Sequence, residues 1–440
     1  SGPMDSIISG VIAIVALLVL LGFGVPIAWA MTAVAIIGMW LVIDGNFAMS
    51  MLETLPYDTG VNFTLVVIPM FILMGGFSSR AGIIEGLYEA VHRFTARAKG
   101  NLIYATIVAS AGFAAASGST LVSSSVFTRI AMPQMLKFGY SPGISAGSIA
   151  ASGTLAALIP PSVGIILIAS LTNQSVGALL IAGVLPGILT AGAYIVGMRL
   201  FLIRYPQWAP STNESYSWRD KFAGLRMVWG VVLLATLIIG GLYSGLFSPS
   251  AAGAVGAAGA LLIGLGMRRL SGNDIWESFK EGTLVSGRLL MILIGGLLMG
   301  RLLLVNGFTD EINNFVASMG VSPMELMIYI AIMFIVLGMF VDSLSLIVIT
   351  LPFLFPISQS LGINEIWFGI IILKLIEIAA ITPPVGLNLF AVMGAAPELK
   401  ASEMYRGIVP FLMIEMVVLM LLFAFPEIAL WLPQTMATGT

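Results

Sequence analysis

The chain has 440 residues, of which 59% are hydrophobic and only 9% are charged, and its formal net charge is −2. Soluble domains carry roughly 25% charged residues, so this composition indicates an all-α protein that crosses a membrane many times. The nearly balanced charge gives no reason to expect a nucleic acid partner, and a chain with no cysteine and one histidine has no disulfide, zinc–thiolate or multi-histidine metal site.

Apolar segments follow one another along the whole chain, and several are shorter than the roughly 20 residues needed to cross a bilayer. In the first half we expect helices over 7–22, 26–43, 62–79, 101–116, 121–136, 143–159, 162–182 and 185–203. In the second half we expect them over 226–246, 250–267, 284–304, 323–341, 343–359, 365–381, 384–396 and 407–425. The short segments are predicted to form two re-entrant hairpins and two helices broken at Pro-Pro pairs.

Two further segments have the spacing of amphipathic helices. In 83–95 the apolar residues share one face, and Glu85, Glu89 and Arg93 lie on the other; the segment 308–319 repeats this arrangement. We predict that both form helices along the membrane surface. The alternative is that they are ordinary connecting loops.

Prolines recur at a fixed spacing along the chain. Pro133 matches Pro356, and Pro160-Pro161 matches Pro383-Pro384, each pair 223 residues apart. Because proline interrupts helices, the helix breaks are duplicated together with the apolar runs. We therefore predict two related halves, 4–203 and 227–440, each with scaffold helices, a surface helix, a hairpin and a broken helix.

The hydrophilic stretch 204–226 falls between the two halves and is predicted to be a cytoplasmic linker. As a spacer, it should tolerate exchange of residues 206–216 with little effect.

The distribution of basic residues predicts how each half is oriented. Lysine and arginine favour the cytoplasmic side of a membrane. The segment 92–99 is basic and its repeat counterpart, about 310–320, is acidic, whereas 44–58 is acidic and its counterpart, about 268–281, is basic. The halves are therefore expected to insert with opposite orientation, as an inverted-topology repeat with both chain termini on the periplasmic side.

Four polar patches interrupt the apolar segments at positions related by the repeat. They lie at 117–125, 152–162, 338–345 and 382–388. Backbone carbonyls freed at a helix break, together with Ser, Thr and Asn oxygens, can form a neutral cage that suits Na⁺, whereas Ca²⁺ and Mg²⁺ sites usually recruit carboxylates. Helix N-termini beside such cages attract an anion. The alternative is that these hydroxyls bond their own helix backbones or help helices to pack closely.

A few charged residues stand inside apolar segments. Lys374 and Glu377 are three residues apart and can pair on one helix face, in a structural or a gating role. Asp342 at a hairpin tip either contacts sodium or caps a helix. Glu415, like two arginines of the second half, is expected near a membrane interface.

Several stretches together resemble the large membrane subunit of TRAP transporters, the tripartite ATP-independent periplasmic type. They are "IPMFILMGGF" (68–77), "SGST" (117–120), "ASGTLAALIPPS" (151–162) and "EIAAITPPVGLNLF" (377–390). The resemblance implies an elevator-type transporter that uses Na⁺ to import a small organic acid anion, of sialic acid or C4-dicarboxylate type. It also implies a small four-helix membrane subunit and a soluble periplasmic substrate-binding protein as partners. Because the chain begins at its own first span, the small subunit is expected to be a separate chain.

The resemblance also assigns site residues, with two or more sodium ions expected as coupling ions. The first sodium cage would use Ser117, Gly118, Ser119, Ser152, Gly153 and Thr154. The second would use Gly338, Asp342, Ser345, Thr382 and Gly386. The substrate anion would lie between them, against Thr120, Ser123, Ser162, Ser343 and Asn388.

Two other function classes compete with this expectation. A stand-alone sodium–carboxylate symporter of the same superfamily would share the hairpins but need no binding protein. An intramembrane enzyme is disfavoured, because Tyr57-Asp58 has no second acidic motif and His92 belongs to a predicted surface helix. A passive channel is disfavoured by the proline-broken inverted repeat.

Overall fold

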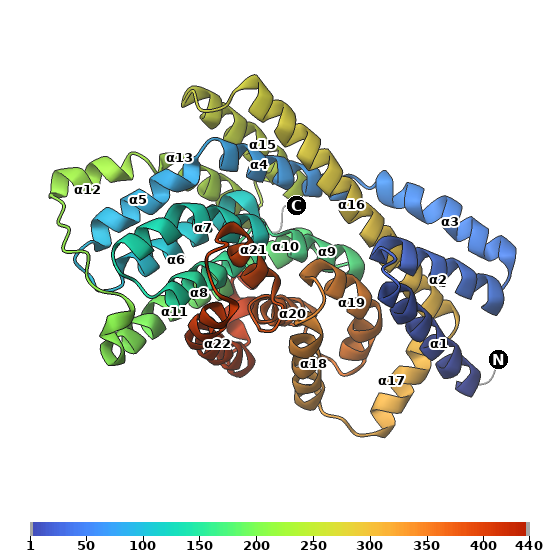
Figure 1. The fold of residues 1–440 in the computed structure, drawn as a ribbon. Coiled ribbons are helices and arrows are strands. Elements are labelled where there is room, and N and C mark those ends of the chain that lie inside the picture. Colours follow the sequence, from blue (N-terminus) through green and yellow to red (C-terminus); the bar gives the residue numbers. More distant parts are fainter. Residues whose placement is uncertain (1–2, 437–440) are drawn as a thin grey trace.

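The computed structural model describes residues 3–436, so both chain termini lie outside the described residues. Every regular element between these limits is a helix (Figure 1). Seven helices of this part of the chain are long and apolar enough to cross a membrane, or up to nine if each bent pair counts as one span. The predicted all-α, multi-pass membrane architecture is confirmed.

The helices of the first half follow the predicted order, except that the helix over 45–60 was not predicted and the segment predicted over 162–182 forms two helices. They are α1 (Pro3–Gly22), α2 (Ile27–Val42), α3 (Gly45–Gly60), α4 (Val67–Arg80), α5 (Ile83–Thr95), α6 (Asn101–Ser117), α7 (Thr120–Lys137), α8 (Pro142–Gly153), α9 (Val163–Thr172), α10 (Val176–Ala182) and α11 (Val184–Arg204). Short 3-10 turns, η1 (Phe63–Val66) and η2 (Thr154–Ala157), precede α4 and follow α8.

The linker contains one short helix, α12 (Trp218–Leu225), and the second half begins after it. The elements of the second half are α13 (Trp229–Ala235), η4 (Thr236–Gly240), α14 (Gly241–Tyr243), α15 (Pro249–Gly266), α16 (Gly272–Val305), α17 (Phe308–Ser318), α18 (Pro323–Gly338), α19 (Ser343–Ser360), α20 (Glu365–Ala380), α21 (Leu387–Ala395), α22 (Ala401–Ala424) and α23 (Glu427–Thr435).

The two hairpins and the two broken helices correspond between the halves. The pair α6–α7 matches α18–α19, and α8–α9 matches α20–α21. Gly139 and Gly362 follow the two hairpins in the same left-handed conformation, with φ of +79° and +71°. Both Pro-Pro bonds are cis. The duplicated prolines and glycines thus stand at equivalent places in the two halves.

One element departs from this correspondence. The repeat predicts separate counterparts of α3 and α4, but α16 is a single helix of 34 residues that covers both. In the first half, Pro56 stands inside α3, and Asn62 caps the 3-10 turn η1. The helix is therefore interrupted between α3 and α4. The matching stretch of α16 contains no proline and continues as a helix.

Helices from opposite halves form the largest pairings of the molecule: α4 with α15, α2 with α16 and α8 with α22. Glycines bring α8 and α22 into backbone contact. A Cβ atom at Gly407 would lie 1.8 Å from the carbonyl oxygen of Gly143, and one at Gly147 would lie 2.3 Å from that of Gly407. Only glycine permits this approach. The first broken helix and the last long helix are therefore one packed body.

The linker contacts helix α5 and the residue that follows it at several points. Thr212 Oγ1 donates to the carbonyl of Ala96 at 3.1 Å, and Glu214 Oε2 lies 2.8 Å from Nε2 of the buried His92. Arg93 reaches the carbonyl of Asp220 at 3.1 Å. The expectation that residues 206–216 can be exchanged freely is not supported, because two of these contacts fall in that range.

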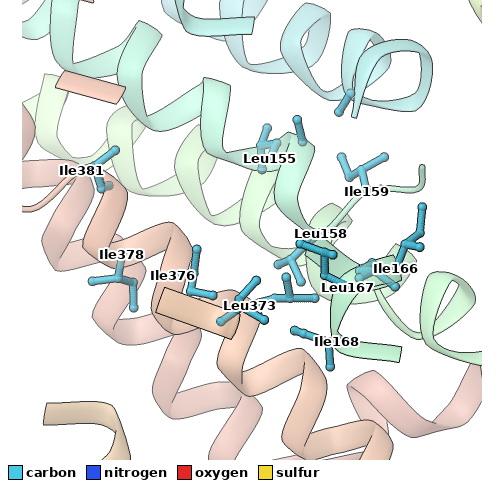
Figure 2. Close-up of a cluster of buried hydrophobic side chains, with 14 of the residues drawn as sticks. Leu155, Leu158, Ile159, Ile166, Leu167, Ile168, Leu373, Ile376, Ile378 and Ile381 are labelled. Carbon is cyan, nitrogen blue, oxygen red and sulfur yellow. The ribbon is translucent and has the colours of Figure 1, made fainter. Parts of the chain in front are cut away.

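A hydrophobic cluster fixes the first broken helix against α20 (Figure 2). Leu155 and Leu158 come from the region of the break, Leu167 comes from α9, and Leu373 and Ile376 come from α20; all five are buried. Fully burying such a side chain contributes roughly 1.5–3 kcal/mol. The break is therefore held in place by packing on both sides.

Candidate functional site

A cavity of about 280 Å³ lies where the two hairpin tips meet. Its wall includes Ser117–Thr120 of the first tip, Asp342 and Ser343 of the second, and Ser162, which follows the first Pro-Pro pair. Leu387 after the second break and parts of α4 and α16 complete it. Segments that are more than 200 residues apart in sequence therefore surround one space.

Backbone geometry sets the position of the first tip. Gly118, with φ of +64°, ends α6, and Ser119 caps α7 by accepting a hydrogen bond from the Val122 amide at 3.4 Å. A Cβ atom at Gly118 would lie 2.5 Å from the carbonyl oxygen of Pro161. The tip therefore touches the break, where Ser162 in turn caps α9. The N-termini of α7 and α9 lie beside the cavity.

The second polar patch lies directly behind the first tip. A Cβ atom at Gly153 would lie 2.1 Å from Ser124 Oγ and 3.2 Å from the carbonyl of Thr120, so the end of α8 touches the first turn of α7. The hydroxyls of Ser123, Ser124 and Ser152 are buried there without a hydrogen-bond partner among the described residues. Thr154 instead donates to the carbonyl of Ala151 at 2.6 Å.

This donor set fits a sodium ion. Buried polar groups without a partner are costly, and each hydroxyl oxygen can coordinate a cation. The residues predicted for the first cage are brought together by the structure, but Ser152, Gly153 and Thr154 lie behind the cavity wall rather than on it. Ser124 belongs to the same group and was not among the predicted ligands.

The second tip is built with an acidic cap. Asp342 Oδ2 accepts a hydrogen bond from the Ser345 amide at 2.9 Å and so caps α19, one of the two roles that its sequence position allowed. Gly338 is pressed against Ala379 of α20, because a Cβ atom there would lie 2.3 Å from the Ala379 Cβ. The second tip therefore packs against the last turn of α20, next to the second break.

The second break has fewer free side-chain oxygens than the first. Thr382 Oγ1 donates to the carbonyl of Ile378 at 2.5 Å, so this hydroxyl bonds its own helix. Gly386 takes the left-handed conformation, with φ of +55°, after the second Pro-Pro pair. The oxygens available to a cation here include backbone carbonyls, the second carboxylate oxygen of Asp342 and Asn388 Oδ1, which is buried without a hydrogen-bond partner among the described residues.

The residues predicted for the substrate fall into two groups. Thr120, Ser162 and Ser343 line the cavity. Ser123 is buried behind the first tip, and Asn388 Nδ2 donates to the carbonyl of Ala150 at 3.2 Å. Asn388 therefore ties α21 to α8, because its amide crosses between the two broken helices.

The part of the cavity wall formed by α4 and α16 carries an ion pair that the sequence did not single out. Arg80 at the end of α4 lies 2.9 Å from Glu281 of α16, and its Nη1 donates to Ser278 Oγ at 3.2 Å. Arg80, Ser278 and Glu281 all line the cavity. Both charged residues stand near the ends of apolar segments, where sequence alone could not show that they face each other.

A buried ionic cluster adjoins the cavity, and one of its members, Glu377, is part of the cavity wall. Lys374 Nζ lies 2.9 Å from Glu377 Oε2, 2.5 Å from Glu415 Oε2 and 2.9 Å from Thr190 Oγ1. Tyr194 donates a hydrogen bond to the second carboxylate oxygen of Glu415. The predicted Lys374–Glu377 pair is present. The expectation that Glu415 lies near a membrane interface is wrong, because it is fully buried and its carboxylate is held by the lysine.

Comparison with known proteins identifies the family. The family model for the DctM component of the tripartite ATP-independent periplasmic transporter matches residues 14–428. The chain is 32% identical over 380 residues to the C4-dicarboxylate TRAP transporter large permease protein DctM of Pseudomonas aeruginosa, covering 86% of this chain and 88% of that one. It is 28% identical over 416 residues to the sialic acid TRAP transporter large permease protein SiaM of Vibrio cholerae, covering 94% and 96%.

The fold has a solved counterpart. The crystal structure of the Alcanivorax borkumensis YdaH transporter matches with a TM-score of 0.60 over 91% of each chain, at 14% sequence identity. This likeness concerns the fold alone. The extent of the family match and the identity to the curated large permeases show that the chain belongs to the family of the DctM component, the large permease subunit of tripartite ATP-independent periplasmic transporters.

Proposed function

We propose that this chain is the transport subunit of a sodium-driven, binding-protein-dependent importer of a small organic acid anion in a bacterial inner membrane. The observation that carries the proposal is the meeting of both hairpin tips and both helix breaks around one cavity, with unpartnered buried hydroxyls directly behind it. The relatives named for C4-dicarboxylate and for sialic acid support an acidic substrate.

Sodium would act by ordering the first tip. Ser123, Ser124 and Ser152 have oxygens without partners, and Gly153 lets α7 approach α8 closely. An ion between these groups would hold the start of α7 against the end of α8. With α7 and α9 fixed, their N-termini would present amide groups to an anion in the cavity. A second ion at the Asp342 tip would act in the same way on α19.

The packing supports an elevator mechanism. The glycine contact joins α8 to α22, and the cluster of Figure 2 joins the first break to α20, so hairpins and broken helices can move as one body. The helices α2, α4, α15 and α16 pair with one another and would form the stationary scaffold. The cavity lies between these two groups of helices. No chemical change of the substrate is part of the proposal.

Two partners belong to the proposed system: a small four-helix membrane subunit as a separate chain, and a soluble periplasmic substrate-binding protein. The test is uptake of labelled succinate and sialic acid into proteoliposomes that contain both membrane subunits. Each is assayed with and without an inward sodium gradient, and with and without the binding protein. Uptake that requires both supports the proposal. Uptake with sodium but no binding protein would favour a stand-alone symporter, and uptake indifferent to sodium would contradict the sodium sites.

A further inference from the structure

The charged side chains of the cavity wall are unevenly distributed. Its acidic members are Glu281, Asp342 and Glu377, whereas Arg80 is the single basic residue among the described residues of the wall. Glu377 shares the Lys374 ammonium with Glu415, and Asp342 is engaged as the cap of α19. An organic anion that enters this cavity therefore meets one side chain of opposite charge.

Arg80 is placed to reach such a ligand. It ends α4, and α4 touches the first tip at Gly75, where a Cβ atom would lie 2.8 Å from the carbonyl oxygen of Ser117. The guanidinium thus belongs to the α4 part of the cavity wall, and Gly75 and Gly76 of the same helix also line the cavity. A guanidinium has five N–H donors, and the hydrogen bonds of Arg80 to Ser278 and Glu281 use two of them.

The present partner of Arg80 is itself a carboxylate and is not buried. The side chains of Arg80 and Glu281 are 27% and 55% exposed. An exposed ion pair contributes little to stability, because water competes for both charges. When a substrate carboxylate replaces the Glu281 carboxylate, the guanidinium exchanges one carboxylate partner for another. The free-energy cost of this exchange is small, because Arg80 keeps a partner of opposite charge.

Resting on the proposed function, we propose that Arg80 binds a carboxylate of the transported anion, and that Glu281 is the resident carboxylate that the substrate displaces. Glu281 then acts as an internal competitor that holds the guanidinium in place while the cavity is empty. Arg80 becomes a specificity-determining residue of the cavity that the N-termini of α7 and α9 also line.

The two members of the pair are expected to respond in opposite directions. Arg80→Gln removes the counter-charge and should raise the KM for uptake at least ten-fold, while the sodium concentration for half-maximal uptake changes less than two-fold. Glu281→Gln removes the competitor and should lower the KM at least two-fold. Arg80→Lys keeps the charge but loses the forked geometry, so its KM should lie between those of wild type and Arg80→Gln.

The matched control is Glu277→Gln, one turn earlier on α16. Glu277 pairs at 3.9 Å with Lys280 on the surface and does not line the cavity, so its KM should stay at the wild-type value. Binding of succinate and sialic acid to each purified variant, measured by thermal shift, gives a second readout that does not depend on uptake.

An ordinary structural pair would behave differently. If both substitutions raised the KM and lowered thermal stability alike, or if Arg80→Gln left KM and ligand binding unchanged, the proposal would be overturned. If uptake did not respond to sodium but the opposite shifts in ligand binding persisted, the sodium coupling would fail and the role of Arg80 would stand. Failure of the wild-type protein to bind either carboxylate would overturn the role of Arg80.

Discussion

Substitution of Lys374 by methionine tests the buried ionic cluster most directly. Methionine has a similar length, so the change removes the charge and leaves the space nearly filled. Lys374, Glu377 and Glu415 are all fully buried, and the ammonium contacts both carboxylates within 2.9 Å. Lys374→Met leaves two acidic groups facing each other with no counter-charge and removes a donor from Thr190.

The expected loss of stability can be bounded. Hydrogen bonds to charged groups contribute about 1.5–3 kcal/mol each, but the contacts of one ammonium are not additive. Removing one partner of a buried ion pair costs about 3–5 kcal/mol, because an uncompensated charge stays behind. We expect Lys374→Met to fall in that range. The triple variant Lys374→Met, Glu377→Gln, Glu415→Gln should recover most of the loss, because no buried charge is left.

The assay is equilibrium denaturation of the purified protein in a fixed detergent, followed by tryptophan fluorescence. Leu373→Met is the control, because it places methionine at the adjacent buried position and conserves volume; it should cost less than about 1.5 kcal/mol. The reasoning would be refuted if Lys374→Met cost no more than this control. It would also be refuted if the triple variant were as unstable as the single one.

Three further predictions concern the sodium cage, the glycine contact and the linker. Ser152→Ala should raise the sodium concentration for half-maximal uptake several-fold, whereas Ser148→Ala, whose hydroxyl bonds its own helix at 2.7 Å, should not; equal responses would contradict the cage. Gly407→Ala should destabilise the protein by several kcal/mol in the denaturation assay, because its Cβ would meet the backbone of α8, while Gly192→Ala, with open space around it, should not. Glu214→Ala should make the linker cleave faster in limited proteolysis through loss of the His92 contact, and an unchanged rate would refute that contact.

The helix breaks and hairpins could be predicted from the sequence because their causes are local. Pro160-Pro161 and Pro383-Pro384 interrupt helices wherever they occur, and Gly118 supplies the left-handed turn of the first tip. The duplicated spacing then identified which breaks belong together. These signals depend on residue type and position alone.

The pairings between distant helices could not be predicted in this way. Glu415 stands among apolar residues in sequence, and only the packing of α22 against α20 brings it to Lys374. Arg80 and Glu281 meet for the same reason, because α4 packs on α16. Ser124 looked like one serine among several, and its lack of a partner becomes visible only when α8 covers it.

The contact between Gly147 and Gly407 has a consequence for how the protein is made. The two glycines are far apart in the chain, and a ribosome adds roughly 5–20 residues per second. The polar first break and the glycine face of α8 therefore stay without their packing partner α22 for roughly 10–50 s during synthesis. During that interval the nascent first half needs a temporary cover, such as lipid or an insertion factor, so final assembly of this permease is an event that follows synthesis.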